Sequence, residues 1–116
     1  MEGKRIGLLV PCDITQDAEY WEYLPDGVTL HITRTGFYPG GLSLEFVEGV
    51  SAPTELHYAT RSLAKIDPDV VCFACTSESF IHGAAEERDV RRVLEAAGAR
   101  LALSTSGALV DALWAL

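Results

Sequence analysis

A thiol and two hydroxyl groups lie side by side in this sequence, directly after a short apolar run. The run extends from Val70 to Ala74 and is followed by Cys75, Thr76 and Ser77. Its β-branched and aromatic residues, preceded by an Asp-Pro-Asp turn, favour a central strand of a parallel sheet. In open α/β sheets, ligands bind at the carboxyl ends of such strands. We therefore predict that this thiol lies at a ligand-binding edge.

A helix is predicted to open near Ser77 or Ser79, just after the thiol. The free N–H groups of a helix start attract anions, and the same field lowers the pKa of a nearby cysteine. The prediction is a reactive Cys75 beside an anion site. The alternative is an inert, buried cysteine, which is common in protein cores. That second interpretation is the one we favour for Cys72, inside the apolar run.

The spacing of Cys72 and Cys75 is that of a C-x-x-C motif, which is found in redox sites and zinc sites. Side chains alternate between the two faces of a strand, so these two thiols should point to opposite faces. The sequence has no second cysteine or histidine pair to complete a tetrahedral zinc site. We predict neither a metal nor an organic cofactor, and the free cysteines are typical of a reducing cytoplasm.

Composition limits the classes of partner. The 116 residues are 48% apolar and 22% charged, which indicates one globular domain. The net charge of −8, without a basic cluster, argues against nucleic acid and anionic membranes as partners. No signal peptide and no run long enough to cross a membrane is recognised. A small anionic substrate remains possible, because a local helix start can override the overall charge.

The first strand is predicted over residues 6–10, and it ends at Pro11 because proline cannot continue a central strand. Pro11, Cys12 and Asp13 should therefore lie at the same sheet edge as Cys75. Thr15 or Asp13 can cap a helix that runs to about residue 23. Asp13 is thus either an ordinary helix cap or a carboxylate that transfers protons or orients a substrate.

Residues 28–33 alternate strictly between apolar and polar, which predicts a half-buried edge strand. Arg34 follows, and its guanidinium could hold a substrate carboxylate by two hydrogen bonds or simply lie on the surface. The next loop, residues 35–43, is rich in glycine. Its Phe37 and Tyr38 either wall a pocket or plug the loop against the core.

The order of the elements predicts the fold. The later elements are a short helix or turn over 44–50, a helix capped by Ser51, a helix ending at Gly98, a strand over 100–103 and a helix capped by Ser104, Thr105 or Ser106. Strands that alternate with helices indicate an α/β fold: a flavodoxin-like, doubly wound parallel sheet with strand order 2-1-3-4 and helices on both faces. Residues 1–104 would form the lobe and residues 105–116 a final helix.

These motifs resemble the aspartate/glutamate racemase superfamily, in the branch of maleate cis-trans isomerases and arylmalonate decarboxylases. The matching pieces are residues 5–11, 31–34, 75–83 and 104–106, in the family's order. The resemblance implies two similar lobes with the active site between them and no cofactor. This chain has about half of that length, so residues 105–116 would lead toward a second lobe that is absent. A missing second lobe or a homo-oligomer is then expected.

The resemblance also implies roles for individual residues. Cys75 would be the first-lobe cysteine that attacks or protonates the substrate, a position that resembles glycine in the decarboxylases. Thr76 and Ser77 would donate hydrogen bonds to a carboxylate or an enediolate. The loop at 11–13 would line the same carboxylate, and the loop at 34–42 would wall the side-chain pocket. The family's asparagine after the first strand is missing from Pro11-Cys12-Asp13-Ile14-Thr15.

Three functions are compatible with these residues. The first is a cofactor-independent, cysteine-based isomerase or racemase of a small carboxylic or dicarboxylic acid, similar to maleate isomerase. The second is a decarboxylase of malonate-like acids. The third is a lobe that binds a small acid or a partner without catalysis.

Overall fold

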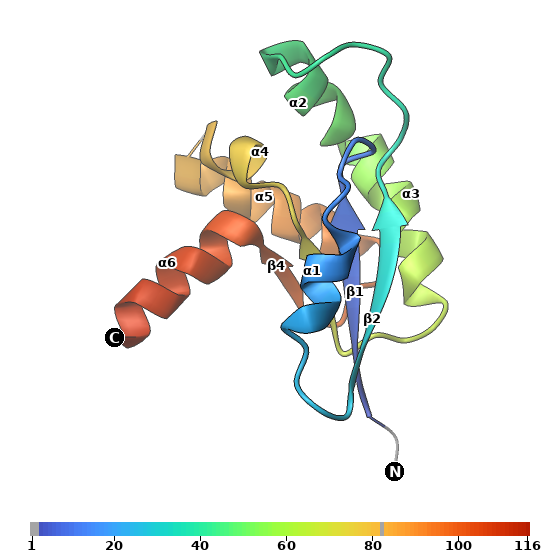
Figure 1. Ribbon diagram of the computed structural model, residues 1–116. Coiled ribbons are helices and arrows are strands. Elements are labelled where there is room, and N and C mark those ends of the chain that lie inside the picture. The colour runs from blue at the N-terminus through green and yellow to red at the C-terminus, as the bar shows by residue number, and fades with distance from the viewer. Residues whose placement is uncertain (1–2, 82) are drawn as a thin grey trace.

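Strand β1 (Lys4–Val10) lies between β2 (Val28–Arg34) and β3 (Val70–Phe73) in a parallel sheet, and β4 (Ala102–Ser104) extends the sheet beyond β3. The computed structural model describes residues 3–81 and 83–116 (Figure 1). The order β2-β1-β3-β4 confirms the predicted order 2-1-3-4.

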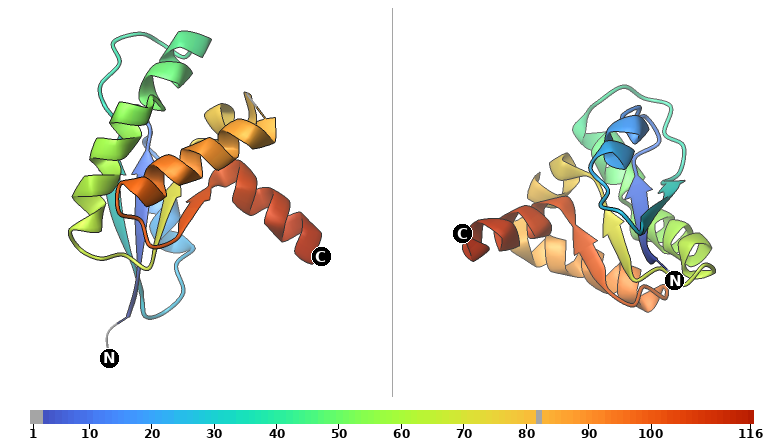
Figure 2. Two further views of the ribbon diagram at one scale, coloured as in Figure 1. Left: turned by 180° about the vertical axis from the view of Figure 1, so that it is seen from behind. Right: turned by 60° about the horizontal axis from the view of Figure 1, so that its bottom comes forward.

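Alternation along the strands divides the core between the two faces of the sheet. Leu9 packs with the apolar side chains of α3 (Pro53–Ala64) and α5 (Gly83–Ala96). Its neighbour Val10 packs on the other face, in a cluster that includes Tyr20 of α1 (Asp17–Glu22). Figures 1 and 2 show α1 in front of the sheet, with α3 and α5 behind it. Helices therefore cover both faces, as the doubly wound fold requires.

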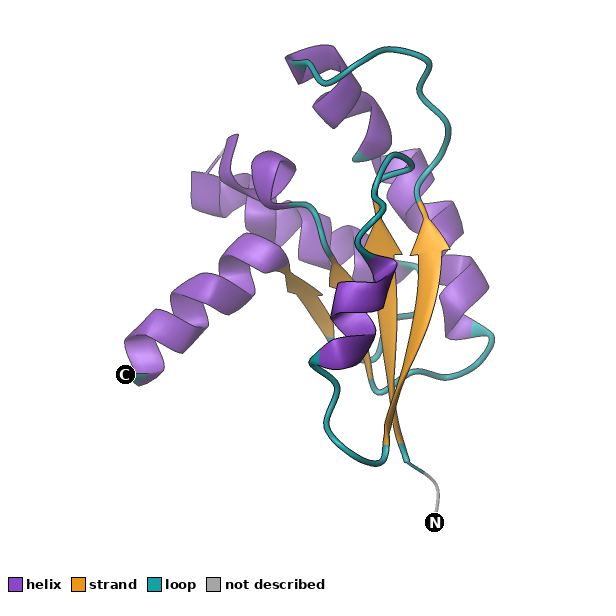
Figure 3. Ribbon diagram, in the orientation of Figure 1, coloured by secondary structure: helices purple, strands orange, loops and turns teal. Residues whose placement is uncertain are grey.

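Three further helices stand at or beyond the carboxyl ends of the strands: α2 (Leu44–Val50), α4 (Thr76–Ile81) and α6 (Thr105–Ala115). The loop from β2 to α2 arches above this edge (Figure 3). Ser43 caps α2, since its hydroxyl accepts a hydrogen bond from the N–H of Phe46 at 3.1 Å. No helix among residues 3–81 and 83–116 has the length and apolar character needed to cross a membrane.

Two predicted helix caps are wrong. Helix α1 begins at Asp17, and neither Asp13 nor Thr15 caps it. The backbone forms a turn first, in which the N–H of Ile14 donates to the carbonyl of Pro11 at 3.2 Å. Ser51 does not cap α3, because its hydroxyl donates to the carbonyl of Val47 at 2.7 Å and so closes α2 instead.

The predicted ends of the later elements are mostly confirmed. Gly98 follows α5 with φ of +117°, the left-handed region that glycine adopts without strain. Ser104 caps α6 by accepting a hydrogen bond from the N–H of Gly107 at 3.1 Å. Strand β4 begins at Ala102, two residues later than predicted.

Replacing Leu94 tests the packing of α5 on the sheet. Leu94 is 0% exposed, so Leu94→Ala should lower the free energy of unfolding by about 2–5 kcal/mol. Leu42→Ala is the matched control, because Leu42 is 80% exposed and its loss should cost less than about 0.5 kcal/mol. Urea denaturation followed by circular dichroism measures both. Equal losses in the two variants would contradict the described packing.

Candidate functional site

The thiol of Cys75 lies two residues beyond β3, at the carboxyl edge of the sheet. The N–H of Ala74 donates to the carbonyl of Leu9 at 2.8 Å, which ties the end of β3 to β1. Cys75 is 9% exposed and packs in the core cluster behind the sheet. Thr76 and Ser77 open α4 and are exposed. The structure thus places a nearly buried thiol beneath two accessible hydroxyl groups.

Burial raises the pKa of the Cys75 thiol above its ordinary value. The backbone N–H groups of Glu78 and Ser77 act in the opposite direction, and the carboxylates of Glu78 and Asp13 raise the pKa further. The net direction contradicts the lowered pKa that we predicted from the helix start alone. The physical reason is that loss of water around a thiolate outweighs two N–H groups of a short helix.

Cys72 points to the opposite face, where it packs against the cluster around Leu8, Val10 and Leu30. Burial raises its pKa to about 11. The predicted divergence of the two thiols is therefore confirmed, and the C-x-x-C spacing does not form a dithiol. Among the residues that the structure describes, no group of three or more His, Cys, Asp or Glu could hold a metal ion.

The loop after β1 brings Asp13 toward the thiol. Pro11 is buried, and Cys12 is half-buried against the apolar side chains of α2. Asp13 is exposed, and its carboxylate lies close enough to Cys75 to raise the pKa of the thiol. Asp13 does not cap α1, and its role as a carboxylate at the site remains a prediction.

Arg34 ends β2 at the same edge, but its guanidinium is engaged with α1 and the preceding loop. It forms two hydrogen bonds with the carboxylate of Asp17, at 2.7 and 3.1 Å, and a third with the carbonyl of Ile14 at 2.8 Å. The hydrogen bond from Arg34 lowers the pKa of Asp17. Arg34 thereby fastens the loop that carries Asp13. Its direct contact with a substrate remains a prediction.

The two aromatic residues of the loop at 35–43 lie in different environments. The ring of Tyr38 packs edge-on against Phe46, with centroids 5.5 Å apart and planes at 87°. Phe37 is 86% exposed. Tyr38 therefore plugs the loop against α2, whereas Phe37 remains available at the surface.

Two residues of the site were not singled out in the sequence. Glu78 is buried beside the thiol. The Ser79 hydroxyl donates to the carbonyl of Cys75 at 2.9 Å and accepts a hydrogen bond from the N–H of Ser106 at 3.3 Å. They lie three and four residues after Cys75, which directly precedes α4, and this spacing was the available signal.

Two cavities flank α4, and Cys75 lines neither of them. One, of about 210 Å³, lies between α4, α5 and α6 and is lined by residues that include Ser79 and Glu87. The other, of about 330 Å³, is lined by Glu78 and by residues of α3 and α5. Among the residues of the sheet edge, Thr76 and Ser77 are exposed, whereas the Cys75 side chain is packed into the core cluster.

No protein-family model matches this chain, and no curated protein matches it in sequence. Solved structures do match. A mutant of the maleate cis-trans isomerase of Nocardia farcinica with a covalently bound succinylcysteine intermediate has a TM-score of 0.75 and 24% identity, over 97% of this chain and 48% of that chain. The maleate isomerase Iso of Pseudomonas putida S16 has a TM-score of 0.70 and 22% identity, over 93% and 47%.

Arylmalonate decarboxylase matches as well. A liganded double mutant, in which a glycine is replaced by cysteine and a cysteine by serine, has a TM-score of 0.75 and 25% identity, over 97% of this chain and 46% of that chain. The predicted resemblance to this branch of the aspartate/glutamate racemase superfamily is confirmed in the fold. The chain spans about half the length of the solved structures it matches.

Replacing Asp13 tests the electrostatics of the thiol. Asp13→Asn removes a negative charge that raises the pKa of Cys75, so this pKa should fall and the thiolate should form at lower pH. The measurement is the pH dependence of Cys75 alkylation, site by site, by mass spectrometry. Asp26→Asn, in the exposed turn before β2, is the control and should leave the profile unchanged. An unchanged profile in Asp13→Asn would remove Asp13 from the site.

Proposed function

We propose that this chain is one lobe of a cofactor-independent, cysteine-based isomerase or racemase of a small carboxylic or dicarboxylic acid. The observation that carries the proposal is the Cys75 thiol at the carboxyl end of central strand β3, beside the exposed hydroxyls of Thr76 and Ser77. The fold shared with maleate isomerases supports the class of substrate. The succinylcysteine intermediate described for one of those enzymes supports a reacting thiol.

The exposed groups around the thiol suit a carboxylate. Thr76 and Ser77 would donate hydrogen bonds to a substrate carboxylate or to the enediolate formed from it. The loop at 11–13 would line the same group, and Arg34 would contribute by holding that loop and by its positive charge. No metal or organic cofactor has a role in this scheme.

The raised pKa favours a proton-transfer role for Cys75, because the thiol stays protonated at neutral pH. In the proposed step, a carboxylate such as that of Asp13 takes the α-proton of the acid, and the electron pair of the broken C–H bond enters the enediolate. The S–H bond of Cys75 then breaks, its proton moves to the α-carbon and the electron pair stays on sulfur. The N–H groups of Ser77 and Glu78 then stabilise the thiolate. Isomerisation by thiolate attack on a double bond would first need a proton acceptor, and the carboxylates of Glu78 and Asp13 both lie near the thiol.

Two alternatives each rest on one observation. The fold shared with arylmalonate decarboxylase, at 25% identity, supports decarboxylation of a malonate-like acid. The burial of the Cys75 thiol, next to the exposed Thr76 and Ser77, supports a lobe that binds a small acid without catalysis.

The test is to incubate the 116-residue chain in D₂O with maleate, aspartate, glutamate or phenylmalonate and to follow each acid by proton NMR. Conversion of maleate to fumarate, or exchange of the α-proton of an amino acid, is the expected result. Cys75→Ser should abolish it, because the hydroxyl of serine is a much weaker acid than a thiol. Cys72→Ser is the matched control on the opposite face of the sheet, and this variant should retain the conversion or proton exchange.

A second readout separates the alternatives. Alkylation of Cys75 is measured with and without each acid. Loss of CO₂ from phenylmalonate alone would replace the proposal with decarboxylation. Protection of Cys75 without turnover would favour the binding lobe. If no acid is turned over and no acid protects Cys75 from alkylation, the proposal of a small-acid site on this chain is rejected.

A further inference from the structure

The first residues of α6 are fastened to the lobe by hydrogen bonds. Ser106 donates from its N–H to the hydroxyl of Ser79 at 3.3 Å and from its own hydroxyl to the carbonyl of Ser79 at 3.0 Å. The hydroxyl of Thr105 donates to the carbonyl of Phe73 at 3.3 Å. The start of α6 is thus held on both α4 and β3.

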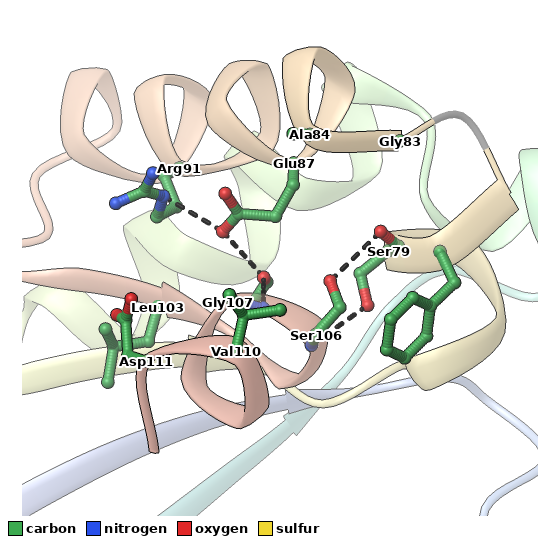
Figure 4. Close-up of a pocket in the computed structure, with 12 residues that line it drawn as sticks. Ser79, Gly83, Ala84, Glu87, Arg91, Leu103, Ser106, Gly107, Val110 and Asp111 are labelled. Carbon is green, nitrogen blue, oxygen red and sulfur yellow. Dashed lines mark hydrogen bonds and ion pairs between the residues drawn. The ribbon is translucent and has the colours of Figure 1, made fainter. Parts of the chain in front are cut away.

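A second set of contacts fastens α6 to α5. The hydroxyl of Ser104 donates to the carboxylate of Glu87 at 2.7 Å, and the same oxygen pairs with Arg91 at 2.9 Å (Figure 4). A Cβ at Gly107 would lie 2.5 Å from that oxygen, so a larger residue there would displace the Glu87 carboxylate. These contacts fix the direction in which α6 leaves the lobe.

Beyond this anchored start, α6 is apolar on every side. Residues 108–116 include a single charged side chain, Asp111. The exposed fractions are 62% for Leu113, 85% for Trp114 and 102% for Leu116. A helix that is hydrophobic all round is normally buried, and large exposed apolar patches mark interaction sites. Figures 1 and 2 show α6 projecting from the lobe, so the lobe itself does not cover it.

We propose that α6 is the docking surface for a second copy of this chain, with the two helices packed against each other across a two-fold axis. Two-fold homodimers bury the same patch on both subunits and are the commonest oligomers. The proposal does not depend on the catalytic function.

The exposed apolar area of α6 reaches the lower limit for a specific interface. Five large apolar side chains of α6 and its end are exposed: Leu109, Val110, Leu113, Trp114 and Leu116. If each side chain contributes on the order of 100 Å² of apolar surface, the five offer roughly 500 Å², without the contribution of the alanines of α6. Two copies would together bury roughly 1,000 Å², which is less than the standard interface of about 1,600 Å² but is at the lower limit for a specific interface.

The distribution of charge also favours α6 as the surface where two copies meet. The chain has a net charge of −8, yet residues 101–116 carry only one carboxylate and no basic group. Two acidic copies repel each other least where they meet through α6. A charged partner would find almost nothing there to pair with. Added salt should therefore strengthen the dimer, because it screens the repulsion between the remaining charges.

Sedimentation equilibrium over a range of micromolar concentrations tests the proposal. The 12.6 kDa chain should reach twice this mass as concentration rises. Trp21→Phe leaves Trp114 as the sole tryptophan, and its emission should shift to the blue over the same range. Leu113→Glu should weaken association by more than about tenfold, because it would bury an unpaired charge.

Leu42→Glu is the matched control, since Leu42 is exposed but lies in the loop before α2. It should leave the dimer intact, and circular dichroism should show the wild-type fold for both variants. If the measured mass stays at that of a single chain at every concentration, the proposal is overturned, and α6 would have to dock on a different molecule. A dimer that tolerates Leu113→Glu would overturn it as well.

Discussion

Burial of β1 and β3 on both faces is the constraint on which the rest of the molecule depends. Leu9, Val10, Val71 and Phe73 are all 0% exposed, so polar side chains can enter only where these strands end. Parallel pairing brings those ends to one edge, because each strand leaves the sheet in the same direction. The thiol of Cys75 and the loop after β1 meet there as a consequence. The chemistry of the edge is set by the few residues that come directly after two apolar strands.

The same burial decides the acidity of the thiol. The N–H groups at the start of α4 stabilise a thiolate, but Cys75 packs into the core cluster and loses water. The carboxylates of Glu78 and Asp13 act in the same direction as burial. The position of Asp13 depends in turn on Arg34, which fastens the loop by its contacts to the carbonyl of Ile14 and to α1. The contacts of Arg34 on one face of the sheet therefore help to hold the loop whose carboxylate raises the pKa of the thiol on the other face.

The sequence predicts what depends on local pattern. The apolar runs predict β1 and β3, strict alternation predicts β2 as an edge strand, and the two-residue period predicts that Cys72 and Cys75 diverge. The predictions for Ser51 and for the pKa of Cys75 were wrong. The Ser51 hydroxyl bonds backward to the Val47 carbonyl of α2 instead of forward to α3, and the pKa of Cys75 is governed by burial in a core built from distant segments. The pairing of Arg34 with Asp17 was not predicted, because it requires the start of α1 to be known. The catalytic roles at the edge remain predictions, since one wall of a site does not define its reaction.

Helix α6 combines two kinds of interaction that act at different ends. Its start is held by polar groups, among which the hydroxyl of Ser104 bonded to the Glu87 carboxylate is buried. Its remainder is apolar and exposed. An apolar tail without such an anchor would fold onto its own lobe, because that is the nearest apolar surface. The anchor prevents this and presents the apolar surface in one fixed orientation. Specific association then requires both ends, since apolar area supplies the free energy and the buried polar contacts supply the geometry.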